Sequence, residues 1–443
     1  MHQLLRMIKM RFDALVIGGG ITGLFTALDL SLRGFRVALV ERGLIGGGTS
    51  GKMHNLIHSG ARYVTNDVES ATECASEGKV LRRIARPFIR ETGGLFVDVD
   101  GDDEFYGEFI NGLKKTGIEY RELSREEALK IEPRLSESVV RAVWVPDGVV
   151  YPLSLMTSVA VAAHDNGAII GQFLKLEAFE LRSDKIERAV VRDMVKGELL
   201  RLEADVYVNT AGPWVGEVAE KAGVEVSVLP TAGAMVVLNG LLNNLVLNRL
   251  RPPSDGDIIV PFNGHSVIGT TASLVESIDE LSFSDEEIQF LIEEASAMVP
   301  DVKRYGVKAV YGSVRPLIKM GGAGGREVSR KFEVYRHDKP VNMVSAAGGK
   351  FSTGRLMGES IGNVVARMMG SSKESRTREY VLPELREPRD FADHNLPLID
   401  EDAHFVASLS STSQGLASDN LWIYSLALIS LMRLHRQKLM RLD

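Results

Sequence analysis

Cysteine is almost absent from this sequence of 443 residues, in which Cys74 is the single example. One cysteine excludes an intrachain disulfide, an all-cysteine zinc site and a cysteine-ligated iron–sulfur cluster. No cluster of histidine, cysteine and acidic residues has the spacing of a metal site, so we expect no bound metal. This cysteine usage favours an intracellular protein, and any redox chemistry would need an organic cofactor.

Long apolar segments are absent as well. The first eleven residues lack the apolar stretch of roughly 7–15 residues found in a secretory signal, so we expect no export. The longest apolar run, at residues 421–432, is shorter than the ~20 residues that span a bilayer. We therefore expect a cytoplasmic protein that does not cross a membrane, and a position at the membrane's inner face stays open.

A strong charge of one sign is the third feature that is lacking. The chain carries 52 Lys+Arg and 59 Asp+Glu, a formal net charge of −7, and 25% of its residues are charged. This mild acidity argues against a nucleic-acid partner, and the composition is typical of a folded globular chain. At about 100–200 residues per domain, the length predicts two or three domains.

Glycine, in contrast, is abundant and grouped. The chain has 43 glycines, nearly a tenth of its residues, against a usual ~7%. A predicted strand at 12–17 runs into Gly18, Gly20 and Gly23, and a predicted helix covers about 20–32. In a Gly-x-Gly-x-x-Gly turn between strand and helix, the first glycine permits the turn and the second admits a pyrophosphate. The third lets the helix pack against the strand.

A second predicted strand, at 36–40, closes on Glu41, 18 residues after the last glycine of the turn. An acid at this distance is expected to accept hydrogen bonds from a ribose 2′-hydroxyl, which disfavours a 2′-phosphorylated nucleotide. The whole pattern predicts dinucleotide binding, although it does not choose between NAD and FAD.

Nucleotide-domain elements recur along the chain. A helix is predicted at 152–164, strands at 172–181, 186–194, 198–203 and 204–209, and another strand at 341–346 before a helix that reaches Met368. We therefore expect an α/β fold with a discontinuous Rossmann-type FAD-binding domain and an inserted α+β substrate domain that carries an antiparallel sheet. The FAD-binding domain would take 12–95, 145–222 and 340–380, the substrate domain 96–144 and 223–339, and a tail 381–443. Capping boxes starting at Ser124 and Ser284 predict two helices of the inserted domain.

Five groups of residues together resemble FAD-dependent glycerol-3-phosphate dehydrogenase, most closely the catalytic subunit of the anaerobic type, within the glycine oxidase and D-amino-acid oxidase superfamily. They are the amino-terminal block, His58-Ser59-Gly60-Ala61-Arg62-Tyr63, Pro253-Ser254-Asp255 with Ile268-Gly269-Thr270-Thr271, Ser313-Val314-Arg315-Pro316-Leu317 and Gly348-Gly349-Lys350. The resemblance covers roughly residues 12–385. The cysteine-rich C-terminal domain that the anaerobic-type subunit commonly carries has no counterpart here, and the tail at 386–443 matches nothing in the family.

The resemblance implies a site that oxidises a phosphorylated secondary alcohol. His58, four residues before Arg62, would be the base, and Lys350 would polarise the substrate oxygen or stabilise reduced flavin. Arg62, Arg315 and Arg330 would hold phosphate, since guanidinium groups match its oxygens two at a time. Tyr63 and Thr271 are further substrate-binding candidates. The candidates for binding FAD are Gly18, Gly20, Ile21, Thr22, Gly23, Glu41, Arg42, Thr49, Ser50, Gly212, Gly349, Lys350, Phe351 and Ser352.

The implied reaction converts sn-glycerol 3-phosphate to dihydroxyacetone phosphate by hydride transfer to FAD, with electrons passed to a quinone or an electron-transfer subunit. Two alternatives stay open: oxidation of a 2-hydroxy acid or amino acid, and a non-catalytic flavin-bound assembly subunit. The tail contains a Ser-rich linker and a helix that is apolar first and basic afterwards, from about residue 420. That helix would dock on this chain or on a homodimer partner, or lie at a membrane surface as a peripheral anchor.

Overall fold

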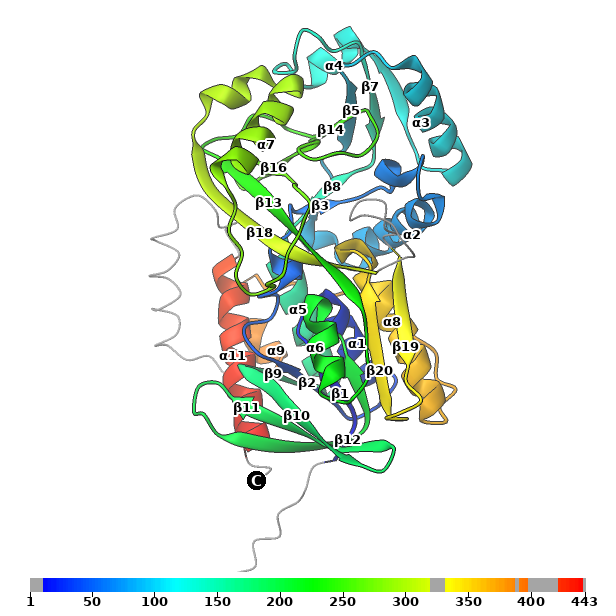
Figure 1. The fold of residues 1–443 in the computed structure, drawn as a ribbon, viewed down its shortest axis with the longest axis vertical. Coiled ribbons are helices and arrows are strands. Elements are labelled where there is room, and N and C mark those ends of the chain that lie inside the picture. The colour runs from blue at the N-terminus through cyan, green and yellow to red at the C-terminus, as the bar shows by residue number, and fades with distance from the viewer. Residues whose placement is uncertain (1–10, 319–330, 387–389, 397–420, 441–443) are drawn as a thin grey trace, which may run out of the picture.

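The computed structural model describes residues 11–318, 331–386, 390–396 and 421–440. Two large sheets stand one above the other, and a smaller three-stranded sheet lies between them (Figure 1). The lower sheet has the strand order β10-β11-β12-β1-β2-β9, and β20 pairs with both β12 and β19. Its strands are β1 (Arg11–Ile17), β2 (Val37–Glu41), β9 (Ile169–Gln172), β10 (Leu174–Arg182), β11 (Lys185–Asp193), β12 (Leu199–Asn209), β19 (Phe332–Arg336) and β20 (Met343–Gly348).

Strand β1 shows how the lower sheet forms its core. It pairs in parallel with β2 on one side and β12 on the other. Its side chains alternate: Ala14 and Val16 pack with three helices, whereas Leu15 and Ile17 join the opposite core under β10 to β12. The three helices are α1 (Ile21–Leu32), α5 (Pro152–Asp165) and α8 (Gly354–Met368), and the short α6 (Val215–Glu220) covers the other face. Helices on both faces explain why β1 and β2 are apolar almost throughout.

The upper sheet is largely antiparallel and has the order β17-β13-β16-β15-β14-β5-β7-β6, with β18 paired to β13. Its strands are β5 (Gly94–Asp98), β6 (Arg121–Ser124), β7 (Arg141–Val145), β13 (Val228–Leu238), β14 (Val246–Arg249), β15 (Ile258–Phe262), β16 (His265–Gly269), β17 (Ser273–Leu274) and β18 (Val307–Ile318). The long strands β13 and β18 run from this sheet down toward the lower one (Figure 1). They therefore carry side chains from the upper sheet to the region between the sheets.

The helices of the upper part are α3 (Asp103–Thr116), α4 (Arg125–Ile131) and α7 (Asp285–Met298). The two predicted capping boxes are confirmed: the hydroxyls of Ser124 and Ser284 accept from the backbone N–H of Glu127 and Glu287. Between the large sheets lie the small sheet of β3 (Leu56–Ile57), β8 (Gly148–Val150) and β4 (Ile89–Arg90), and helix α2 (Val68–Ile84). The expected α/β fold with an added antiparallel sheet is confirmed, whereas the domain boundaries stay a prediction.

Two expectations differ from the structure. The separate strands predicted at 198–203 and 204–209 are one strand, β12, because its first half pairs with β11 and its second half with β20. Strand β19, expected within 223–339 of the substrate domain, instead pairs antiparallel with β20 in the lower sheet. Phe332 and Val334 of β19 pack on the lower core, which draws the strand to that sheet edge.

The C-terminal helix α11 (Leu421–Met440) docks on this chain, against α5 and β9. Ala427, Leu428 and Leu431 join the core of the lower sheet. Between the helix and the sheet, the N–H of Ile170 donates to Nδ1 of His435 at 2.7 Å. These contacts support the docking alternative for the tail.

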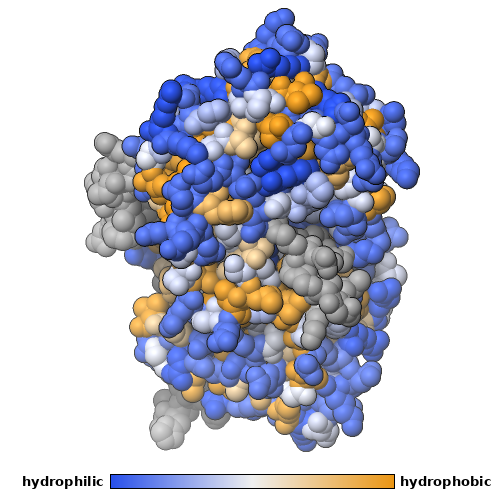
Figure 2. Space-filling view, turned by 45° about the horizontal axis from the view of Figure 1, so that its top comes forward, coloured by the Kyte–Doolittle hydropathy of each residue, from blue (hydrophilic) through white to orange (hydrophobic). Residues whose placement is uncertain are grey.

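The described helices include none that is long and apolar enough to cross a membrane. On the face in Figure 2, hydrophilic residues cover most of the surface and hydrophobic ones form small groups between them. This surface agrees with the charged fraction of the sequence.

The docking of α11 should depend on pH through His435. Burial, with a contribution from His164 and Lys438, lowers the pKa of His435 from 6.5 to about 3. In the unfolded chain this histidine binds a proton as the pH falls through 6.5, whereas in the folded chain it stays neutral until about pH 3. The stability that it contributes is thus fully present above pH 6.5 and is lost as the pH falls below it. We expect the thermal midpoint to fall from pH 7.5 to pH 5, and to fall less in His435→Gln.

His394 supplies the matched control in the same cluster. A hydrogen bond to Asp165 raises its pKa, so its contribution is present at low pH and is lost as the pH rises. His394→Gln should therefore increase the fall of the thermal midpoint from pH 7.5 to pH 5. Identical pH dependence in the wild type and His435→Gln would contradict the assignment.

Candidate active site

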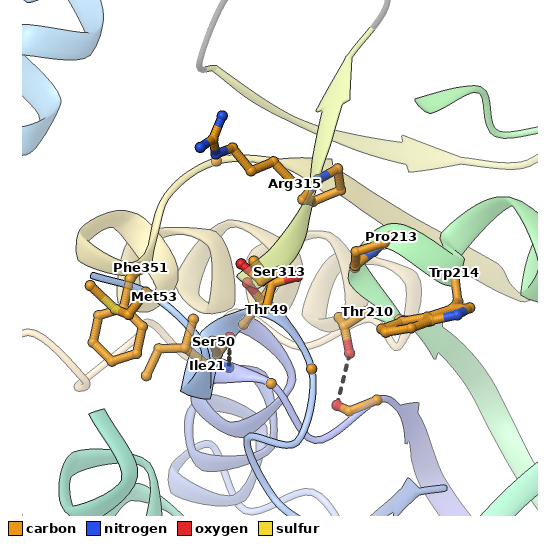
Figure 3. A pocket seen from close by; sticks show the side chains of 18 of the residues that line it. Ile21, Thr49, Ser50, Met53, Thr210, Pro213, Trp214, Ser313, Arg315 and Phe351 are labelled. Carbon is orange, nitrogen blue, oxygen red and sulfur yellow. Dashed lines mark hydrogen bonds between the residues drawn. The ribbon is translucent and has the colours of Figure 1, made fainter. Parts of the chain in front are cut away.

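A cavity of about 490 Å³ opens between the lower sheet and the strands that descend from the upper one. This volume is within the range of small-molecule and cofactor sites, roughly 300–1,000 Å³. Figure 3 shows Trp214 and Pro213 at one end, Met53 and Phe351 at the other, and Ile21, Thr49 and Ser50 between them. The cavity is therefore elongated along the carboxyl edge of the parallel strands, where ligands of open α/β sheets bind.

The glycine turn after β1 forms the floor of this cavity. Gly18 has φ +110°, and a Cβ there would lie 2.6 Å from the carbonyl oxygen of Thr210. A Cβ on Gly23 would lie 1.9 Å from the carbonyl oxygen of Gly18, so helix α1 packs against the strand end as closely as backbone permits. Gly20 is the N-cap residue of α1 and has no side chain to cap the helix, and the Ser50 hydroxyl accepts from the N–H of Ile21 at 3.1 Å. The turn fits a pyrophosphate at a helix N-terminus.

Glu41 lies at the end of β2 beside the turn. One of its carboxylate oxygens accepts from Gly19 N at 2.7 Å and the other from Gly43 N at 2.8 Å. These bonds order the turn, and each oxygen retains a lone pair toward the cavity that Glu41 lines. The ribose contact expected from the sequence is compatible with this placement and stays a prediction.

Arg42 and Trp214 form the cavity wall at the end where Pro213 also lies. The Arg42 guanidinium lies 4.0 Å from the centre of the Trp214 ring, and it pairs with Asp279 at 2.5 Å. Trp214 belongs to the turn Gly212–Trp214, from which the sequence analysis selected only Gly212. The signal that could have found Trp214 is its place beside the small residues that follow β12, where a flat side chain can face the cavity.

The residues expected to take part in the reaction lie close to one another. The ring centre of His58 is 5.7 Å from that of Tyr63 and 5.7 Å from that of His54. The Lys350 ammonium lies 5.0 Å from the centre of the Tyr63 ring, although these residues are nearly 290 positions apart in the chain. All four line the same cavity, together with Arg62 and Arg315.

Arg62 and Arg315 reach the cavity from different elements. Arg62, in the turn Ala61–Tyr63, donates from Nη2 to Asp257 Oδ2 at 2.9 Å. Arg315, on β18, donates to the hydroxyl of Thr270 and to the carbonyl of Thr271, the latter at 2.9 Å. A Cβ on Gly233 of the neighbouring β13 would lie 2.4 Å from the Arg315 guanidinium, so this glycine makes room for it. Hydrogen bonds to other parts of the chain thus fix both guanidinium groups.

Three candidates are not among the described residues that line the cavity: Thr271, Gly23 and Arg330. Thr271 is buried, its hydroxyl accepts from Ala234 N at 2.9 Å, and it is not among the residues that line the cavity; its expected substrate contact stays a prediction. Its neighbour Thr270 lines the cavity instead. Gly23 lies behind the wall, where it allows the close packing of α1. Arg330 lies outside the described residues.

The remaining cofactor candidates line the cavity, and their roles stay predictions. Those that line the cavity are Gly18, Gly20, Ile21, Thr22, Glu41, Arg42, Thr49, Ser50, Gly212, Gly349, Lys350, Phe351 and Ser352. Met53, Ser313 and Met357 line it as well and were not expected from the sequence. Thr49 donates to the backbone carbonyl of Val314 and so ties the glycine-rich loop at residues 46–51 to β18. Loop and strand therefore close around one elongated space.

The single thiol lies next to the site but is not reactive, and no metal-binding group of side chains is found among the described residues. Within the described parts of the chain, no three His, Cys, Asp or Glu side chains could hold a metal ion together. Cys74 lies 3.8 Å from the Ser352 hydroxyl, and burial raises the pKa of its thiol despite the nearby Lys350. Cys74 is thus a neutral packing residue behind the site at physiological pH.

Comparison with known proteins gives consistent matches. The family model described as FAD dependent oxidoreductase matches residues 13–367. The A subunit of anaerobic glycerol-3-phosphate dehydrogenase from Escherichia coli (strain K12) is 36% identical, over 85% of this chain and 71% of that protein. The A1 subunit of the same-named enzyme from Haloferax volcanii is 37% identical, over 84% of this chain and 66% of that protein. The solved glycerol-3-phosphate dehydrogenase from Bacillus halodurans, complexed with FAD, shares the fold: its TM-score is 0.66 at 22% identity, over 98% of this chain and 78% of that one.

The packing of α1 makes a test of the glycine turn. In Gly23→Ala the new methyl group would meet the carbonyl of Gly18, push α1 away from β1 and widen the turn. We expect the purified variant to retain less than about a tenth of the bound dinucleotide, measured as the ratio of flavin to protein absorbance.

Gly107→Ala is the matched control. Gly107 lies in α3, and a methyl group on it would have nothing within 4 Å. This change should leave the bound cofactor unchanged and stabilise the helix by about 0.5–1 kcal/mol. Full cofactor content in Gly23→Ala would contradict the proposed turn.

Proposed function

The chain belongs to the FAD-dependent oxidoreductase family, and from this premise we propose that it oxidises sn-glycerol 3-phosphate to dihydroxyacetone phosphate. The observation that carries the proposal is the meeting of Arg62, Arg315 and Lys350 in one cavity beside His58. Several cations beside a candidate base suit an alcohol that carries a phosphate group. FAD is the cofactor, and it supplies the acceptor for the hydride that leaves the substrate carbon.

The residues of the lower sheet would hold FAD along the elongated cavity. The turn with Gly18 and Gly20 would receive the pyrophosphate, and Glu41 would bond the ribose of the adenosine half. The glycine pair before Lys350 would let the flavin ring approach the backbone, since Gly348 and Gly349 have φ of +79° and +78°. The N–H groups at the start of α1 attract negative charge, which favours a pyrophosphate there.

The substrate end separates two tasks. Arg62 and Arg315 would bind phosphate oxygens, because planar guanidinium groups form paired, charge-assisted hydrogen bonds with them. This grip would place the C2 hydroxyl near His58, whose imidazole would take the hydroxyl proton as the carbon–oxygen bond becomes a carbonyl. Lys350 would donate to the same substrate oxygen and so favour the developing carbonyl.

A 2-hydroxy acid or an amino acid, the alternative substrates, fits the positively charged residues of the cavity less well. A 2-hydroxy acid or an amino acid carries one carboxylate, for which one arginine is sufficient. Here two arginines and a lysine from three separate elements line the same cavity. A non-catalytic subunit would have no need of that arrangement.

Reduced cofactor must pass its electrons on, and among the described residues no group of three or more His, Cys, Asp or Glu side chains could hold a metal ion. The Escherichia coli relative is named as one subunit of its enzyme, so we propose an electron-transfer partner or a quinone as the acceptor. Peripheral contact with the inner face of the membrane and a homodimer belong to the same proposal. Sedimentation of the holoprotein with and without anionic vesicles tests both, since binding and mass are measured together.

Arg315→Ala tests the phosphate grip. The loss of a charge-assisted contact should raise the dissociation constant for glycerol 3-phosphate by about tenfold to a hundredfold, measured from the concentration dependence of anaerobic flavin reduction. Arg304→Ala, at an exposed position, is the control and should leave that constant unchanged. An unchanged constant in Arg315→Ala would remove this residue from the site.

His58→Gln tests the base. Glutamine retains hydrogen-bonding groups but cannot accept the proton, so the limiting rate of flavin reduction should fall by roughly 10²–10⁴. The dissociation constant should change by less than about threefold. A limiting rate equal to that of the wild type would show that another group takes the proton.

A further inference from the structure

Asp257 is a buried carboxylate directly behind the substrate end of the cavity. It lies just before β15, with 1% of its surface exposed. One carboxylate oxygen, Oδ2, accepts from Arg62 Nη2 at 2.9 Å and from Ser254 N at 2.5 Å. The other, Oδ1, accepts from Arg251 Nε at 2.9 Å. Both oxygens are thus covered by donors of this chain.

Arg62 is held on one side only. Its Nη2 donates to Asp257 and also to the carbonyl of Ser254 at 3.1 Å, so both hydrogens of that nitrogen are used. Within the described residues, Nε and Nη1 of Arg62 have no hydrogen-bond partner. The side chain lines the cavity, and a tenth of it is exposed there. The donors that remain are therefore those available to a ligand.

The charges behind Arg62 are balanced along a chain of ion pairs. Arg251 bonds Asp257 and also Glu294, the latter at 2.5 Å. Arg249 bonds Glu294 at 3.0 Å and Asp100 at 2.6 Å. Three arginines thus alternate with three acids from the cavity toward the surface. This network restrains Asp257 from the side opposite Arg62, so the carboxylate has a fixed position from which to hold the guanidinium.

We propose that Asp257 is the positioning residue of Arg62 and, through it, sets the affinity of the site for the phosphate group. The inference rests on the proposed function, in which Arg62 binds that phosphate. A guanidinium fixed on one edge loses little freedom when its other edge binds an anion, which raises affinity. The negative charge of Asp257 is offset by the positive charge of Arg251, which pairs with its other carboxylate oxygen.

A double-mutant cycle tests this coupling. Arg62→Ala, Asp257→Asn and the double variant are compared as holoproteins by the dissociation constant of glycerol 3-phosphate in anaerobic flavin reduction. Each single change should raise the constant by about tenfold to a hundredfold, and the limiting rate should change by less than about threefold. The double variant should bind within about threefold of Arg62→Ala, because Asp257 acts only through Arg62.

Asp98→Asn is the matched control. Asp98 is also buried, in the same sheet, and pairs with Arg141 at 2.8 Å away from the cavity. This variant should lose thermal stability without a change in the dissociation constant. If the dissociation constant of Asp98→Asn rises as much as that of Asp257→Asn, the loss of a buried ion pair is by itself sufficient to weaken binding. That result would overturn the proposal.

Arg62→Lys decides the question if Asp257→Asn does not retain FAD. Lysine keeps the charge, but one ammonium group cannot hold Asp257 on one edge and present a separate planar edge to phosphate. We expect its dissociation constant to resemble that of Arg62→Ala, and a wild-type value would overturn the inference. If Arg62→Ala itself binds normally, the proposed role of Arg62 fails. If Arg62→Ala binds weakly and Asp257→Asn normally, only the positioning role fails.

Discussion

The close approach of helix α1 to the end of β1 is the constraint on which the rest of the site depends. Gly18 and Gly23 remove the side chains that would separate the turn from Thr210 and the helix from the turn. Because α1 is so close, its N-cap residue Gly20 and its first residues Ile21 and Thr22 line the cavity. The same helix packs against α5 and α8, so the core of the lower sheet sets the position of the glycine turn that we propose for the dinucleotide.

The second requirement is that charge from distant parts of the chain meets at one place. Arg62 follows the glycine-rich loop, Arg315 arrives on β18, and Lys350 follows β20. The pairing of β18 with β13 positions Arg315, and the absence of a side chain at Gly233 leaves space for its guanidinium group. Arg62 is held by its ion pair with the buried carboxylate of Asp257. The upper sheet therefore fixes Arg62 and Arg315 at a cavity whose floor the lower sheet forms, whereas Lys350 follows a strand of the lower sheet.

Local patterns were sufficient for much of this arrangement. The strand, glycine turn and helix at the start of the chain and the two serine capping boxes are each encoded within a few residues, so these elements could be predicted from the sequence. Thr270 rather than Thr271 faces the cavity because Arg315 bonds Thr270 and Ala234 bonds Thr271. These partners are far apart in the chain, so no local sequence pattern predicts the difference. The sheet joined by β19, the cavity wall at Trp214 and the contact between Asp257 and Arg62 likewise depend on residues far apart in the chain. The roles of the individual site residues stay predictions.

Anaerobic reduction of the purified wild-type holoprotein tests the central claim most directly. With saturating sn-glycerol 3-phosphate, the account predicts that the flavin absorbance bleaches fully and that one dihydroxyacetone phosphate forms for each FAD, whereas glycerol at the same concentration leaves the flavin oxidised. A flavin that stays oxidised with glycerol 3-phosphate, or that glycerol bleaches equally well, would contradict the account.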